Sequence, residues 1–167
     1  MRLGGNDHAA PSVRDTNKRR VWGLYLTAAV VLFVTATVGI GVHSRMVIGE
    51  ENYHHALSQH LYYAWEQLIG TVLLLLPFLL LACIAADFSI KGSVGLGATV
   101  FVVGAVLLFV LYYKGYVDSE IAMKNKHWTA AALSLGLLPF ESLGVVVLLL
   151  IGGLIAGKRK NANTEAQ

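Results

Sequence analysis

The chain has 167 residues, of which 56% are hydrophobic and only 14% charged, and its formal net charge is +3. An ordinary soluble domain has about a quarter of its residues charged, so the composition argues against a soluble protein. No basic groove with interleaved aromatic residues is evident, so we expect no nucleic-acid partner.

The chain begins with a polar segment, residues 1–20, that mixes Gly, Pro, Asn and charged residues, and we expect a flexible cytoplasmic tail there. Four long apolar runs follow, at about 21–42, 68–86, 93–113 and 128–157. Runs of about 18 or more apolar residues indicate transmembrane helices, and continuous runs favour helices over a barrel. Short connections favour antiparallel neighbours. The sequence therefore predicts an all-α integral membrane protein with a four-helix antiparallel transmembrane bundle over residues 21–157.

The distribution of cations predicts the orientation of these helices. Cytoplasmic segments of membrane proteins collect Lys and Arg. Of the 13 Lys and Arg residues, nine lie in the tails 1–20 and 158–167 and the loop 87–92, whereas four lie in the loops 43–67 and 114–127. We therefore expect both termini and the inner loop 87–92 to lie in the cytoplasm, and the loops 43–67 and 114–127 to lie on the outer side. The expected membrane is the plasma membrane or the bacterial inner membrane.

The first outer loop is rich in histidine. Residues 52–67 contain good helix formers and no Gly or Pro, which predicts a helix that runs into the second span. The outer side carries His43, His54, His55, His60 and His127, and Glu50, Glu51, Asp118 and Glu120 offer oxygen ligands for a metal. Two ligands on one helix face need a spacing of three or four residues, which His54, His55 and His60 lack. We expect no metal site; a pH-responsive surface and a row of polar interfacial residues remain open interpretations.

The fourth run contains an ionisable residue, Glu141, two positions after Pro139. As one straight helix, residues 128–157 would measure about 45 Å, whereas the hydrocarbon core is about 30 Å thick. We therefore predict a kink or break near Pro139, which would place Glu141 in the first turn of a new segment, where a carboxylate is favoured.

At a similar depth to Glu141 we expect Thr35, Thr37, Gln67 and Tyr112. Together they predict a polar layer in the outer leaflet that holds water, an ion, a lipid headgroup, or only its own hydrogen bonds. Carboxylates within membranes often mark ion or proton pathways, which is one interpretation of Glu141. The others are a structural carboxylate satisfied by the helix break and a contact with a partner.

Small residues predict where helices touch. Gly153 and Gly157 form a G-x-x-x-G pattern in the fourth run. This pattern is typical of packing within a bundle, and a dimer face or a docking face for a larger complex is the alternative.

No catalytic motif is present, so we expect a protein without enzymatic activity or cofactor. The single cysteine, Cys83, excludes an intramolecular disulfide. The favoured function is a small tetraspan scaffold, assembly factor or accessory subunit whose partners are the lipid bilayer and other membrane subunits or further copies of itself. One alternative is a proton- or cation-handling channel or transporter subunit that uses Glu141. The other is an extracytoplasmic pH or metal sensor that uses the histidine-rich loop.

Overall fold

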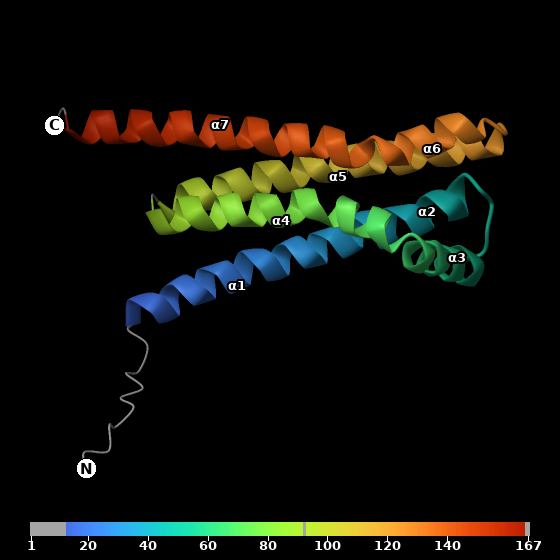
Figure 1. The fold of residues 1–167 in the computed structure, drawn as a ribbon, viewed down its shortest axis with the longest axis horizontal. Coiled ribbons are helices and arrows are strands. Elements are labelled where there is room, and N and C mark those ends of the chain that lie inside the picture. The colour runs from blue at the N-terminus through green and yellow to red at the C-terminus, as the bar shows by residue number, and fades with distance from the viewer. Residues whose placement is uncertain (1–12, 92, 166–167) are drawn as a thin grey trace, which may run out of the picture.

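All regular structure in the described part of the chain is helical (Figure 1). The computed structural model describes residues 13–91 and 93–165, with the side chains of residues 16–91 and 93–158. Residues 1–12 of the expected tail lie outside this part. In chain order the elements are α1 (Val13–Val34), the π-helical turn η1 (Thr35–Gly39), α2 (Ile40–Val47), α3 (Tyr53–Glu66), α4 (Leu68–Lys91), α5 (Val94–Lys124), α6 (Trp128–Gly136) and α7 (Leu138–Glu165).

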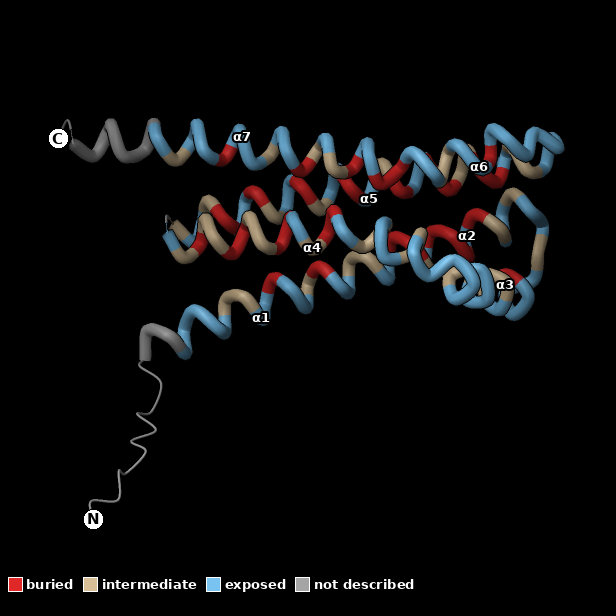
Figure 2. The backbone as a smooth tube through the Cα atoms, in the orientation of Figure 1, coloured by how far each residue is buried: buried red, intermediate tan, exposed pale blue. Residues whose placement is uncertain are grey.

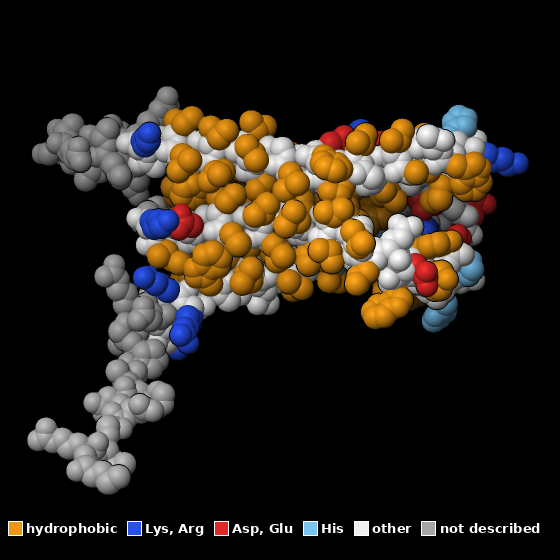
Figure 3. Space-filling view, in the orientation of Figure 1, with side chains coloured by type: hydrophobic (Ala, Val, Ile, Leu, Met, Phe, Trp, Pro, Cys, Tyr) orange, Lys and Arg blue, Asp and Glu red, His pale blue; other side chains and the backbone are white. Residues whose placement is uncertain are grey.

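Four helical segments are long and apolar enough to cross a membrane, and they indicate an integral membrane protein. They are Thr16–Val47, Leu68–Lys91, Val94–Lys124 and Trp128–Lys158. The segments lie side by side, and α1 begins and α7 ends at the same end of the molecule, which we call the terminal end; the opposite end is the α3 end (Figure 1). Hydrophobic side chains cover most of the middle of the molecule. Most charged side chains gather toward its two ends, and a small group of acidic and basic side chains lies between the ends, on the upper edge of the view (Figure 3).

The helices extend beyond the apolar runs of the sequence. α1 begins at Val13, inside the expected tail, and α5 continues to Lys124, through most of the expected loop 114–127. Ser119 and Glu120 are buried in this last part of α5. Packing against neighbouring helices therefore continues α5 after its apolar run has ended.

The core is a thin line of buried residues between the helices (Figure 2). Its largest members include Phe78 of α4 and Tyr112 of α5, whose ring centroids are 4.9 Å apart. At the terminal end, a Cβ on Gly97 of α5 would overlap the Ala85 carbonyl oxygen and the Ser89 hydroxyl of α4. The absence of a side chain at Gly97 therefore lets the two helices approach closely. The Ser89 hydroxyl in turn lies 2.9 Å from the Tyr25 hydroxyl of α1. Close approach of this kind is how helices associate without a hydrophobic driving force in lipid.

The two glycines of the G-x-x-x-G pattern face other helices of the same chain. A Cβ on Gly153 would lie 2.5 Å from the Phe88 ring of α4, so only glycine fits there without a shift of that ring. A Cβ on Gly157 would lie 3.9 Å from Leu96 of α5, which is an ordinary contact. Gly153 therefore serves packing within the chain.

At the α3 end, α2, α3, α6 and the last part of α5 extend past the start of α4 and form an additional layer. The Tyr112 hydroxyl donates a hydrogen bond to the Leu74 carbonyl oxygen. Leu74 lies six residues after the start of α4 at Leu68. The same distance along α5 from Tyr112 reaches Asp118, so α5 extends past the start of α4 from about Asp118 onward. Farther along α5, the Ser119 hydroxyl donates to the Ala131 carbonyl oxygen of α6 at 3.3 Å. We call this layer, residues 40–66 and 115–136, the cap.

Three irregularities divide the helices. In η1 the Ile40 amide reaches back to the Thr35 carbonyl oxygen, five residues earlier instead of four. α3 is the helix expected over 52–67, but the expectation that it runs into the second span is wrong, because the backbone turns at Gln67 (φ −107°, ψ 49°). The third irregularity is at Leu137, between α6 and α7, two residues before Pro139.

Candidate functional site

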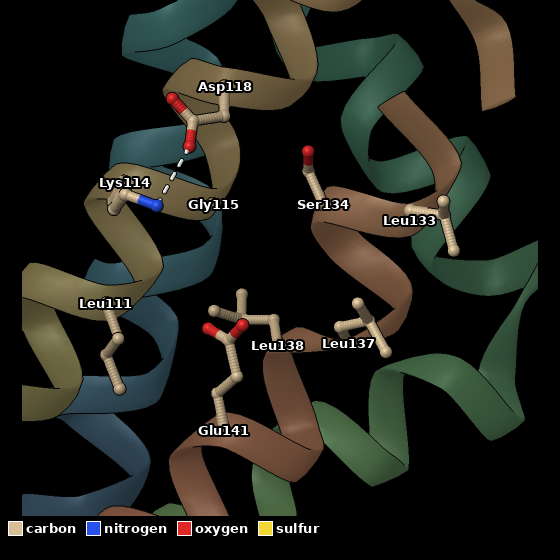
Figure 4. A pocket seen from close by; sticks show the side chains of 9 residues that line it. All are labelled: Leu111, Lys114, Gly115, Asp118, Leu133, Ser134, Leu137, Leu138 and Glu141. Carbon is tan, nitrogen blue, oxygen red and sulfur yellow. Dashed lines mark ion pairs between the residues drawn. The ribbon is translucent and has the colours of Figure 1, made fainter. Parts of the chain in front are cut away.

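A pocket of 220 Å³ lies between α5, α6 and α7, and Glu141 lies in its lining (Figure 4). Its apolar walls are Leu111, Leu133, Leu137 and Leu138. Its polar groups are Lys114, Asp118, Ser134 and Glu141. The Lys114 ammonium and the Glu141 carboxylate approach the same space from different helices. The pocket thus combines both signs of charge with an apolar wall.

The helix break places Glu141 at this pocket. The amides of Phe140 and Glu141 both donate to the Leu137 carbonyl oxygen, at 3.0 and 3.1 Å, so a new helix starts there. Proline is tolerated in a first turn because its missing amide hydrogen would have no partner anyway. Glu141 lies in this first turn, as expected from the sequence. The exposed amides and the helix dipole favour a carboxylate at this position.

The charges of the pocket are only partly paired. Lys114 and Asp118 form an ion pair of 3.3 Å along α5. The Ser134 hydroxyl donates to the Ala130 carbonyl oxygen at 3.0 Å, which leaves its lone pairs free to accept. Among the described side chains, Glu141 has neither an ion pair nor a hydrogen bond. With all three groups ionised, the lining has one negative charge more than positive charges.

The other residues of the expected polar layer do not line this pocket. Thr35 and Thr37 donate to carbonyl oxygens of their own helix, those of Val31 and Phe33, at 2.9 and 2.8 Å. Tyr112 is fully buried and bonded to α4, and Gln67 is exposed at the turn between α3 and α4. The structure therefore brings none of these four into contact with the pocket that Glu141 lines.

The five histidines of the α3 end are dispersed. His43, His54, His55 and His127 are exposed, and the His55 ring lies 2.8 Å from the Gln59 amide nitrogen. Within the described residues, no group of three or more His, Cys, Asp and Glu side chains is arranged to hold a metal ion.

His60 differs from the other histidines because it is largely enclosed in the cap. Its ring packs on Gly41, where a Cβ would lie 2.6 Å from it, and lies 5.9 Å from the Tyr116 ring. Burial, and then the positive charge of Arg45, lower the pKa of His60 to about 4. The imidazole is therefore neutral at physiological pH.

The sequence did not predict an ion pair that holds the cap together. Arg45 Nε of α2 lies 3.3 Å from Glu120 Oε1 of α5, and the two side chains are only 14% and 10% exposed. Arg45 also donates to Gln59 Oε1 at 2.8 Å and lies 5.5 Å from the centre of the Tyr63 ring, both on α3. One guanidinium thus joins three helices. Nothing in a single sequence indicates which distant carboxylate an arginine meets.

Fold and pocket together are those of a helical integral membrane protein with a small, charged pocket open to its surroundings. No protein-family model, no curated protein and no solved structure matches the chain. Its function therefore has to be inferred from its own residues.

Proposed function

We propose that this protein is a non-enzymatic tetraspan protein that acts as a scaffold, assembly factor or accessory subunit. In this proposal the four segments cross the plasma membrane or the bacterial inner membrane as an antiparallel bundle, with both termini in the cytoplasm. The charges support this orientation, because cytoplasmic ends collect Lys and Arg. The terminal end carries Lys18, Arg19, Arg20, Lys91 and Lys158. The cap carries three, Arg45, Lys124 and Lys126.

The observation that carries the proposal is the exposed apolar face of α6 in the cap. Leu133 is 54% exposed, and Leu137, one turn later on the same side and just after the helix, is 50% exposed. The 24 residues of α4 measure about 36 Å and already exceed the ~30 Å hydrocarbon core. α6 lies beside the part of α5 that extends past α4, in the headgroup layer or above it. Exposing leucine side chains to water or headgroups costs free energy, whereas exposing them to hydrocarbon does not. A partner protein that covers these leucines would remove that cost.

A pair of variants tests this proposal. Leu133→Glu puts a charge on the α6 face, and Leu61→Glu puts one on α3, whose Leu61 is 52% exposed and which lies on the other side of the cap (Figure 1). We would purify the wild type and both variants in mild detergent, identify co-purifying proteins, and measure the mass of each complex by light scattering. We expect the wild type and Leu61→Glu to keep the same partner, either another subunit or a second copy, and Leu133→Glu to lose it. A monomer without partners in the wild type, or equal retention by all three, would contradict the proposal.

The pocket supports a second candidate function, the handling of protons or cations by Glu141. Its carboxylate has no partner among the described side chains and faces an ion pair, an arrangement that ion pathways use. A chain with four helices and one such carboxylate would have to oligomerise to enclose a pore. For reconstituted protein this function predicts ion or proton flux that Glu141→Gln alters. Identical flux for the two forms, or none in either, would eliminate it.

A further inference from the structure

The Glu141 pocket lies at the depth of the lipid headgroups on the cap side. Glu141 precedes Lys158 by 17 residues, or about 26 Å of helix, and Lys158 marks the terminal end of the same span. The hydrocarbon core is about 30 Å thick, so Glu141 lies close to its other boundary. On α5, Lys114 lies just past Tyr112, which is level with Leu74 near the start of α4. Exposed aromatic side chains such as Trp65, just before α4, are typical of this boundary.

With two carboxylates and one ammonium, the lining favours a ligand with a cationic group, and Lys114 offers a contact for an anionic group beside it. Among the described side chains that line the pocket, the polar groups of α6 and α7 are acceptors: the Glu141 carboxylate, which no described side chain pairs, and the lone pairs of Ser134. The α5 side offers the Lys114 ammonium, which shares its charge with Asp118 at 3.3 Å. A ligand with a cationic tip and an anionic group a few atoms away would satisfy both sides. An anion alone would meet an excess of negative charge.

The lining also limits the kind of cationic group. A primary ammonium can donate hydrogen bonds to Glu141 and Ser134, whereas a quaternary ammonium cannot and is recognised by aromatic cages. The residues that line the pocket include no aromatic side chain. The pocket measures 220 Å³, many times the roughly 10–15 Å³ that one water molecule needs, so it has room for a small polar group.

We propose that this pocket binds the headgroup of a phospholipid with a primary ammonium, of the phosphatidylethanolamine class. The ammonium donates to Glu141 and Ser134, the phosphate lies toward Lys114, and the acyl chains run past Leu111 of α5 into the hydrocarbon core. The proposal does not depend on the protein having a partner subunit.

Native mass spectrometry of the delipidated protein tests the proposal. The protein would be incubated with an equimolar mixture of phosphatidylethanolamine, phosphatidylcholine and phosphatidylglycerol, and the lipid adducts that survive activation would be counted. We expect phosphatidylethanolamine adducts to dominate. Glu141→Gln should lower them about tenfold or more, because hydrogen bonds to charged groups are the strong ones. Glu66→Gln, which changes an exposed carboxylate at the end of α3, should leave them unchanged.

Several results would overturn the proposal. They are equal retention of phosphatidylethanolamine and phosphatidylcholine, a preference for phosphatidylglycerol, and unchanged adducts in Glu141→Gln. The melting temperatures of the wild type and Glu141→Gln would be compared first. We expect them to differ by no more than a few degrees, because Glu141 is exposed, has no partner among the described side chains, and loses only its weak interaction with the helix dipole. If Glu141→Gln melts lower than this, Ser134→Ala takes its place in the test. We expect Ser134→Ala to show a smaller but selective loss of phosphatidylethanolamine adducts. If Ser134→Ala shows no loss, the proposed site is refuted.

Discussion

The ion pair between Arg45 and Glu120 yields the most demanding prediction. Glu120→Gln keeps the shape of the side chain and removes its charge, which leaves the Arg45 guanidinium in a largely enclosed site. Breaking a buried ion pair from one side costs about 3–5 kcal/mol, because the remaining charge is desolvated without compensation. The two side chains are still 14% and 10% exposed, and Arg45 keeps its contacts with Gln59 and Tyr63. We therefore expect a loss of about 2–3 kcal/mol in the free energy of unfolding.

The assay is reversible unfolding in detergent, followed by circular dichroism, for four proteins. Besides the wild type and Glu120→Gln, these are the double variant Arg45→Met/Glu120→Leu and the control Glu50→Gln. Replacing both charges by apolar residues of similar size removes the uncompensated charge, so we expect the double variant to lie within about 1 kcal/mol of the wild type. Glu50 belongs to an exposed pair with Lys124, and its loss should have no measurable effect.

Two results would refute this reasoning. One is a Glu120→Gln variant as stable as the wild type, which would mean that Arg45 is solvated in the folded protein. The other is a double variant that loses more stability than Glu120→Gln, which would mean that the side chains stabilise the cap by something other than their mutual charge.

Three further predictions concern His60 and the helix contacts. The folded protein keeps His60 neutral, with a pKa of about 4, whereas the unfolded chain protonates it below pH 6.5. The free energy of unfolding should therefore fall by up to about 3 kcal/mol as the pH drops from 6.5 through 4. Melting curves of His60→Gln over the same pH range should lack this loss. If the wild type and His60→Gln show the same pH dependence, His60 is not a pH sensor. Gly97→Ala should destabilise the protein by about 2 kcal/mol or more in detergent unfolding, whereas Gly95→Ala, where nothing lies within 4 Å, should be neutral or slightly stabilising. Tyr25→Phe removes the hydrogen bond to Ser89 and should cost about 1 kcal/mol in the same assay.

The sequence predicted the helices well because apolar runs report directly on a membrane environment. It predicted their ends less well, because an apolar run ends where lipid contact ends. α5 shows the difference: residues after Tyr113 are mixed in polarity, yet the helix continues to Lys124 because protein replaces lipid as its neighbour. The new first turn at Glu141 was predictable, since Pro139 acts locally on the backbone.

The residues that build the cap and the pocket come from distant parts of the chain. Arg45 was interpreted only as a charge that orients the helices, and Glu120 as a possible oxygen ligand; their positions in the sequence are far apart and no local pattern connects them. The same holds for Lys114, which entered only as one of four outer cations. Pairing between helices depends on how they rotate and slide against each other, and a hydropathy profile does not specify that geometry.

The π-helical turn at Thr35–Gly39 determines which side of α2 faces the rest of the cap. Each residue of an α-helix advances the side chains by about 100°, so one extra residue in a turn changes the angular phase of everything that follows. Deleting a single residue there would restore regular α-helix and swing Arg45 away from Glu120, although no residue of the cap itself had changed. The π-helical turn therefore divides the first membrane helix into two parts whose faces are rotated independently. The part before the turn packs on α4 within the bilayer, and the part after it packs on α3 and α5 beyond the bilayer.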